Sequence, residues 1–96
     1  MPNKINIRQR QVVYHKAIER FGPPNQMIKA IEEMSELTKV LAKILVMGGE
    51  VSLDELIEEV ADVTIMMEQL RLMYNINDEV CEMMDGKIRR LEGRVK

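Results

Sequence analysis

The sequence has little of several residue types that often direct a fold. Its 96 residues include one cysteine, three prolines and no tryptophan, and aromatic residues make up only 3%. Cys81 alone cannot form an internal disulfide, which excludes a disulfide-stabilised fold and favours a reducing, cytoplasmic compartment. Apolar residues still account for 46% of the chain, supplied by aliphatic side chains and nine methionines. Such a composition is typical of packed helices.

Long apolar runs and a strong net charge are also missing. The apolar runs fall far short of the roughly 18 residues that cross a bilayer, and the segment Met1–Arg10 is polar, so we expect no membrane segment and no secretory signal. Fourteen basic and sixteen acidic residues give a net charge of −2, which argues against direct nucleic-acid binding. The sequence contains no glycine-rich phosphate loop, so phosphate recognition would use metal ions and basic side chains.

Glycine, proline and asparagine divide the chain into four segments with helical periodicity. Asn25 and Ser52 are expected to cap helices, Glu55 to complete a capping box with Ser52, and Gly48 to end a helix. One domain over residues 1–96, all-α and built as a four-helix bundle, is the predicted fold. The expected helices are Ile7–Phe21, Gln26–Met47, Ser52–Tyr74 and Asp78–Gly93.

The third expected helix carries apolar residues on two opposite sides. Leu56, Val60 and Val63 follow one side at helical spacing, and Ile57 and Ile65 lie on the other. A helix that is apolar on two sides is normally buried on two sides, and a short chain offers limited cover. We therefore expect a homodimer or a larger homo-oligomer.

One octet occurs twice, 26 positions apart. Residues 31–38 read IEEMSELT and residues 57–64 read IEEVADVT. Residues three apart share a face of a helix, so the octets form two carboxylate pairs, Glu33 with Glu36 and Glu59 with Asp62. A turn at the Gly48-Gly49 pair would make the two helices antiparallel and let these pairs face each other.

Four carboxylates in one place repel each other and are expensive to desolvate. A chain that places them beside apolar residues normally needs a compensating cation. An oxygen-only ligand set favours Mg²⁺, Mn²⁺ or Ca²⁺ over zinc. The octets therefore predict a divalent cation site, and they leave Mg²⁺, Mn²⁺ and Ca²⁺ as alternatives.

These acids also carry a family resemblance. Glu32-Glu33-x-x-Glu36, followed after 22 residues by Glu59-x-x-Asp62, resembles the signature of the MazG-like all-α nucleoside triphosphate pyrophosphohydrolase superfamily. The resemblance covers about residues 7–94: a leading helix, the two acidic helices, and a last helix that ends in residues 87–91 and resembles the Asn-x-Lys-Phe-x-x-Arg stretch of MazG-type members. Asp85 replaces the asparagine of that stretch and Ile88 the aromatic residue.

The resemblance implies a MazG-like helical bundle that forms homodimers or homotetramers, with sites walled partly by neighbouring chains. It implies that Mg²⁺ is held by Glu33, Glu36, Glu59 and Asp62, with Glu32 and Glu58 in support or binding a further ion. The implied reaction is attack of an activated water on the α-phosphorus of a nucleoside triphosphate, which releases pyrophosphate and a nucleoside monophosphate. Either Glu33 or Glu36 could orient that water as general base.

Basic residues near the C-terminus are the predicted substrate contacts. Lys87 and Arg90 could clamp phosphates, although cations near a helix C-terminus also favour the helix dipole without any ligand. Two other functions fit the same residues. One is the related phosphoribosyl-ATP pyrophosphatase activity. The other is a non-catalytic helical oligomer or regulatory binding protein, in which the acids pair with lysines or arginines across an interface.

Overall fold

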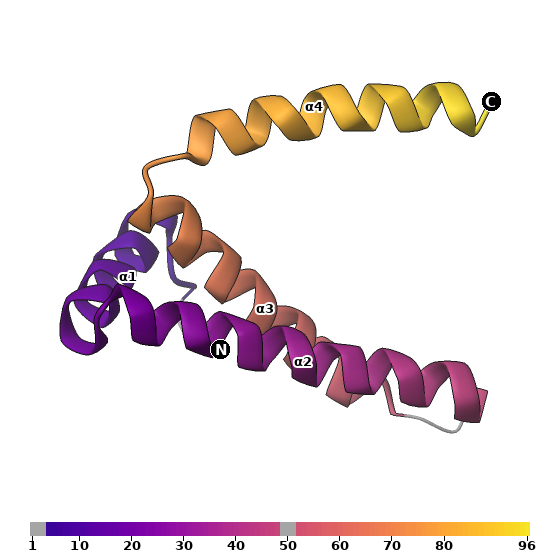
Figure 1. Ribbon diagram of the computed structural model, residues 1–96, viewed down its shortest axis with the longest axis horizontal. Helices are drawn as coiled ribbons and strands as arrows, with labels where there is room; N and C mark the ends of the chain where they lie inside the picture. Colours follow the sequence, from indigo (N-terminus) through magenta and orange to yellow (C-terminus); the bar gives the residue numbers. More distant parts are fainter. Residues whose placement is uncertain (1–3, 49–51) are drawn as a thin grey trace.

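The computed structural model describes residues 4–48 and 52–96. Within these ranges it contains four helices and no strand, so the all-α prediction is confirmed (Figure 1). None of the described helices is both long and apolar enough to cross a membrane. The helices are α1 Ile7–Phe21, α2 Pro23–Met47, α3 Leu53–Met73 and α4 Asn77–Arg94.

Helix α2 begins three residues earlier than predicted. Pro23 and Pro24 occupy its first turn, where a missing N–H is tolerated because that donor has no partner within the helix. Gly22 precedes them with φ of 88°, a conformation that glycine adopts without strain. The prediction that Asn25 caps the helix was wrong: its Nδ2 donates a 2.7 Å hydrogen bond to the Phe21 carbonyl.

The junction between α2 and α3 follows the prediction in part. Gly48 ends α2 with φ of 63°, and Gly49 lies outside the described residues. Ser52 caps α3 as expected, since its Oγ accepts a 3.1 Å hydrogen bond from the Asp54 backbone N–H. Glu55 does not form the expected capping box with Ser52; its carboxylate lies 3.3 Å from Lys43 Nζ of α2.

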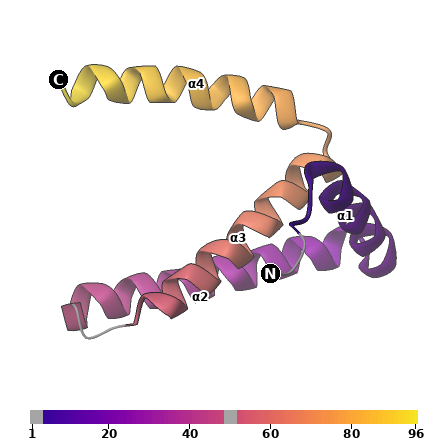
Figure 2. The same ribbon diagram turned by 180° about the vertical axis from the view of Figure 1, so that it is seen from behind.

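Helices α2 and α3 run antiparallel and form the main tertiary contact of the chain (Figures 1 and 2). Val40 and Met66, which are 26 positions apart like the octets, are both buried between them at 6% and 4% exposure. Equivalent positions of the repeat therefore face the partner helix, Val40 toward one end of the hairpin and Met66 toward the other. Ala30 completes the buried apolar residues of α2.

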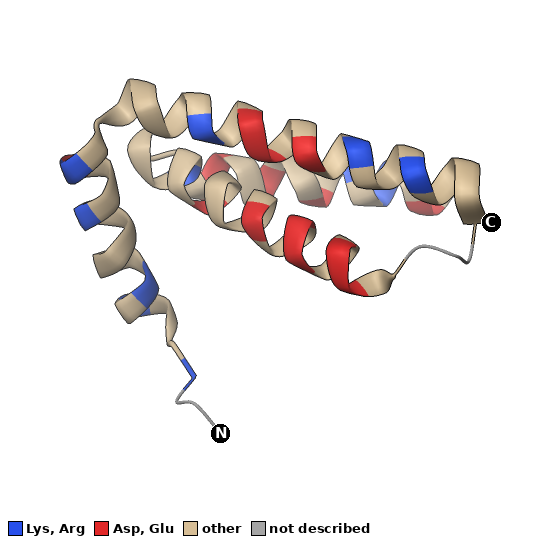
Figure 3. Cartoon of the chain, turned by 90° about the horizontal axis from the view of Figure 1, so that it is seen from below, with Lys and Arg blue, Asp and Glu red and all other residues tan. Residues whose placement is uncertain are grey.

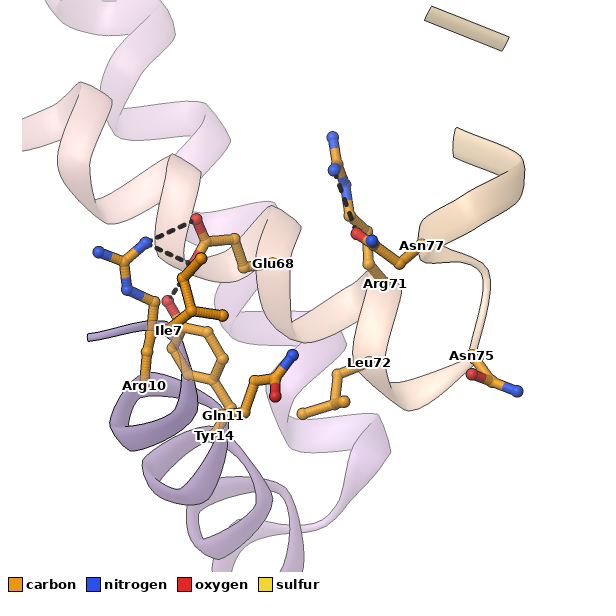
Figure 4. Close-up of a pocket in the computed structure, with 9 residues that line it drawn as sticks. All are labelled: Ile7, Arg10, Gln11, Tyr14, Glu68, Arg71, Leu72, Asn75 and Asn77. Carbon is orange, nitrogen blue, oxygen red and sulfur yellow. Dashed lines mark hydrogen bonds and ion pairs between the residues drawn. The ribbon is translucent and has the colours of Figure 1, made fainter. Parts of the chain in front are cut away.

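Helix α1 packs across one end of this hairpin. The Tyr14 hydroxyl donates a hydrogen bond to Glu68 of α3, and Arg10 Nη1 forms an ion pair with the same carboxylate at 3.2 Å (Figure 4). Burial, followed by the hydrogen bond to Glu68, raises the pKa of Tyr14 to about 12. Nearby, Gln26 Nε2 donates a 2.6 Å hydrogen bond to Gln69 Oε1 between α2 and α3. Polar pairs thus fix the position of the helices at this end.

Helix α4 diverges from the hairpin (Figures 1 and 2). Among the described helices it packs only against α3, and its residues 77–94 include none that is buried. The radius of gyration is 16.2 Å, against about 12 Å for a compact chain of this length. One chain therefore does not close the predicted four-helix bundle, and the second apolar side of α3 is exposed, with Ile57 at 65%.

Candidate metal centre

Three of the four predicted acids meet at the middle of the hairpin. Glu33 comes from α2, and Glu59 and Asp62 come from α3; one carboxylate oxygen of each lies within 4.8 Å of the others. All three side chains are half-buried. Figure 3 shows the acidic turns of α2 and α3 side by side, with basic turns on either side of those in α2. We call Glu33, Glu59 and Asp62 the acidic cluster.

Glu36, the fourth predicted ligand, lies outside this cluster. Its side chain is 51% exposed, and its carboxylate is 3.4 Å from Lys39 Nζ, three residues further along α2. Its negative charge nevertheless acts on Glu59, whose pKa it helps to raise. Glu36 is therefore a neighbour of the cluster and not one of its converging ligands.

The cluster holds negative charge that its surroundings do not balance. Burial raises the pKa of the Glu59 carboxyl, and the charges of Asp62 and Glu33 raise it further. Burial likewise raises the pKa of the Asp62 carboxyl, with the Glu33 charge as the next cause. Both directions have the same physical origin, since desolvation and like charges each disfavour an ionised carboxyl.

Lys29 supplies partial compensation from the preceding turn of α2. Its Nζ lies 3.0 Å from Glu33, whose side chain is 13% exposed, and the hydrogen bond to Glu33 raises the pKa of Lys29. Lys29 also lowers the pKa of Asp62, against the larger effects that raise it. Lys29 therefore compensates Glu33 and, more weakly, Asp62, and it is not among the groups that shift the pKa of Glu59.

A buried oxygen atom indicates what the cluster lacks. Glu59 Oε2 is buried and has no hydrogen-bond partner among residues 4–48 and 52–96. A buried polar atom without a partner is destabilising, and a carboxylate oxygen more so. A divalent cation could pair with this oxygen and reduce the repulsion among the three acids. The donor set contains only carboxylate oxygens, which suits Mg²⁺ or Mn²⁺, so the residues present fit such an ion.

A groove of about 540 Å³ adjoins the acidic cluster along the hairpin. Glu59 and Glu36 lie on its walls together with Lys39 and Lys43 of α2. These lysines are not among the site residues predicted from the sequence, although Glu36, Lys39 and Lys43 follow one face of α2 at spacings of three and four residues. That spacing was the signal that could have identified them.

The predicted phosphate ligands of α4 lie elsewhere. Lys87 and Arg90 are exposed and border a shallow depression lined by α4 residues alone. Because α4 makes no contact with α2 in the described part of the chain, one chain does not bring Lys87 or Arg90 to the acidic cluster. Any contact of these residues with a substrate held there would have to come from a neighbouring chain.

A separate cavity of about 370 Å³ lies between α1, the end of α3 and the start of α4 (Figure 4). Its charged groups already have partners: Arg10 pairs with Glu68, and Arg71 Nη1 donates a 3.3 Å hydrogen bond to Asn77 Oδ1. None of the three cluster carboxylates lines this cavity. We therefore place the candidate site at the acidic cluster and its groove.

Comparison with known proteins finds no matching family model, no matching curated protein and no matching solved structure.

Proposed function

We propose that this protein is a Mg²⁺-dependent, MazG-like pyrophosphohydrolase that cleaves a nucleoside triphosphate to a nucleoside monophosphate and pyrophosphate. The observation that carries the proposal is the convergence of Glu33, Glu59 and Asp62, with Glu59 Oε2 buried and unpaired. Both octets contribute acids to this cluster, Glu33 from the first and Glu59 and Asp62 from the second. Acidic side chains without a ligand-binding role would instead be expected to be solvated or each paired with a basic side chain.

The three cluster carboxylates would hold the cation. When bound, Mg²⁺ would supply positive charge for the substrate phosphates and lower the pKa of a water molecule. Glu36 is the better candidate for the general base, because its carboxylate lies on the groove wall beside Glu59 and outside the converging cluster. Both glutamates pair with a lysine, but the Lys39–Glu36 pair is exposed and 3.4 Å long, whereas the Lys29–Glu33 pair is 3.0 Å long and Glu33 is a cluster ligand. In this role Glu36 would accept a proton from the attacking water as that water adds to the α-phosphorus.

The groove beside the cluster would hold the triphosphate. Its volume of about 540 Å³ is within the range of small-molecule sites, and Lys39 and Lys43 would face the phosphate oxygens as point charges. Their present partners are exposed carboxylates at 3.4 and 3.3 Å, and exposed ion pairs exchange at little energetic cost. Lys87 and Arg90 would add phosphate contacts if a neighbouring chain supplied them.

Pyrophosphate release tests this function. The full chain is incubated with canonical and modified nucleoside triphosphates, deoxynucleoside triphosphates and phosphoribosyl-ATP, with Mg²⁺ or with a chelator. Asp62→Asn is compared with Asp54→Asn, which makes the same change on the same helix at an exposed position outside the cluster. The wild type and Asp54→Asn should release pyrophosphate only with the cation, and Asp62→Asn should not. Release that survives Asp62→Asn or chelation would contradict the proposal.

A non-catalytic helical scaffold is the second candidate, and one observation favours it. Three acids near the octets already pair with lysines, in Lys29–Glu33, Lys39–Glu36 and Lys43–Glu55. Thermal unfolding separates the two functions. A cation site should raise the unfolding midpoint with Mg²⁺ at constant ionic strength, because the ion binds the folded state. A scaffold held by ion pairs should show no gain with Mg²⁺ at constant ionic strength, and a small loss when added salt raises the ionic strength and screens those pairs.

A further inference from the structure

The cavity between α1, the end of α3 and the start of α4 holds a positive charge that the proposed function does not use. Its volume is about 370 Å³, and none of the three cluster carboxylates lines it. The charged groups of its lining are the guanidinium groups of Arg10 and Arg71 and the carboxylate of Glu68. The lining therefore carries one net positive charge.

The Glu68 carboxylate is already compensated by α1. It accepts a hydrogen bond from the Tyr14 hydroxyl, and its two oxygens lie 3.3 and 3.2 Å from Arg10 Nη1 (Figure 4). Arg10 and Glu68 thus balance each other's charge at one side of the cavity. The unbalanced positive charge of the lining belongs to Arg71.

The Arg71 guanidinium has only neutral partners in the described part of the chain. Its Nη1 donates a 3.3 Å hydrogen bond to Asn77 Oδ1. Two sulfur atoms of α4 are its other neighbours, Cys81 Sγ at 4.0 Å and Met84 Sδ at 3.4 Å, and sulfur is a weak acceptor. Arg71 is half-buried. A partly desolvated cation without a counter-ion indicates a position where an anion would be stabilising.

The rest of the lining suits the body of an organic molecule. Ile7, Tyr14 and Leu72 provide apolar walls, and Gln11 adds an amide that can both donate and accept hydrogen bonds (Figure 4). Small-molecule sites typically combine apolar walls with a few polar groups, and their volumes run from about 300 to 1,000 Å³. A cavity of about 370 Å³ therefore fits a compact organic ligand and would be poorly filled by a bare ion.

We propose that this cavity binds a small organic anion whose phosphate or carboxylate group pairs with Arg71. The planar guanidinium offers two parallel N–H donors to either group. The body of the ligand would lie against Ile7, Tyr14 and Leu72, with Gln11 as a further hydrogen-bond partner. The site uses neither the acidic cluster nor a metal ion, so it stands or fails independently of the proposed activity.

Calorimetry on the full chain tests the proposal, in a buffer free of divalent cations, phosphate and chelators. The probes are adenosine monophosphate, adenosine, succinate and inorganic phosphate. At least one of the two organic anions, adenosine monophosphate or succinate, should bind. Preference for the first assigns a phosphate ligand, and preference for the second assigns a carboxylate ligand. Adenosine has the same body without the anionic group, so it should bind at least roughly 10-fold more weakly than adenosine monophosphate if the ligand is a phosphate.

Two pairs of variants locate the ligand. Arg71→Gln removes the charge and should weaken binding at least roughly 10-fold, whereas Arg89→Gln, at an exposed position outside the cavity, should bind like the wild type. Gln11→Trp should fill the cavity from an exposed position of α1 and weaken binding similarly, without altering Arg71. Val13→Trp is its control, because Val13 is 57% exposed and does not line the cavity.

Several results would overturn the proposal. They are failure of both organic anions to bind, inorganic phosphate binding as tightly as the preferred organic anion, and unchanged affinity in Arg71→Gln or Gln11→Trp. If Arg71→Gln fails to fold, Gln11→Trp decides the outcome. Asp62→Asn separates this site from the acidic cluster, since its affinity should equal that of the wild type. Binding that requires Mg²⁺ and is lost in Asp62→Asn would place the ligand at the cluster and overturn the proposal.

Discussion

Polar side chains are paired at the end of the α2–α3 hairpin near α1, whereas at the middle of the hairpin their pairing is incomplete. Near α1, Gln26 donates a hydrogen bond to Gln69, and both side chains are buried. Glu68 accepts a hydrogen bond from Tyr14 and forms an ion pair with Arg10. At the middle of the hairpin, three carboxylates converge within 4.8 Å, and one buried oxygen has no partner among the described residues.

This difference separates structural polar groups from candidate functional ones. A buried polar group whose hydrogen bonds are all formed helps to specify how the helices pack, and it needs no ligand to compensate it. Like charges gathered beside an unpaired oxygen reduce stability, so they indicate a position where a ligand compensates them. The comparison therefore predicts opposite responses to mutation: substitution at the bonded end should destabilise the fold, and substitution in the acidic cluster should impair function while leaving the metal-free fold intact.

Asp62→Asn should give the largest effect. Pyrophosphate release should fall roughly 1000-fold, because a metal ion contributes several kcal/mol to the transition state. The unfolding midpoint of the metal-free protein should stay constant or rise, since the change removes one of three like charges. Turnover assays and thermal unfolding in a chelator measure the two quantities. A loss of activity accompanied by a loss of stability would contradict the contrast between the acidic cluster and the bonded end of the hairpin.

Gln69→Leu should destabilise the other end by about 1–3 kcal/mol, because it leaves the Gln26 amide buried without its partner. The double variant Gln26→Leu/Gln69→Leu should recover most of that loss, since both polar groups are then gone. Urea unfolding of the single and double variants gives the free energies. A double variant that loses the sum of both single effects would show that the pair does not act as a unit.

Tyr14→Phe should cost about 1–2 kcal/mol, because a hydrogen bond to a charged acceptor is lost at a partly exposed site. The pKa of Tyr14 is raised to about 12, so the folded state retains this proton more strongly than the unfolded state. The stabilisation is fully present below the ordinary pKa of 10 and declines as the pH rises from 10 to 12. Between pH 10 and 12, the free energy of unfolding measured in urea should decline more steeply for the wild type than for Tyr14→Phe. Parallel declines would contradict a raised pKa of Tyr14.

The pH dependence of the metal-free cluster should be the smallest effect. Glu59 and Asp62 have raised pKa values, so their penalty is absent below the ordinary carboxyl range near pH 4 and grows as the pH rises above it. Unfolding midpoints measured in a chelator should therefore fall over this interval relative to those of Asp62→Asn. Mg²⁺ should oppose the fall by compensating the ionised carboxylates. The raised pKa values would be contradicted if the wild type gained stability relative to Asp62→Asn as Glu59 and Asp62 ionise.

Much of the fold could be predicted because its signals are local. Helical periodicity and Gly48 were enough to predict four helices in the described residues. Ser52 was correctly predicted as an N-cap, because its hydroxyl accepts a hydrogen bond from a backbone N–H in the first turn of the helix that it precedes. The predicted start of α2 was wrong, because the prediction assigned Pro23 and Pro24 to a loop. Proline is tolerated in the first turn of a helix, and both prolines lie there in the structure. The octets predicted that four acids converge, and three of them, Glu33, Glu59 and Asp62, do so, because a repeat places equivalent side chains on equivalent helix faces.

By itself the sequence determined the four helices, the two octets and the candidate acids, since spacing of three and four residues sets which side chains share a helix face. Only the tertiary structure decided that Glu33, Glu59 and Asp62 converge while Glu36 stays outside, that Lys39 and Lys43 border the adjoining groove, and that α4 leaves the hairpin. These outcomes depend on how two helices cross and on which atoms lose contact with water. Both are properties of residues distant in sequence, so helical spacing could not determine them.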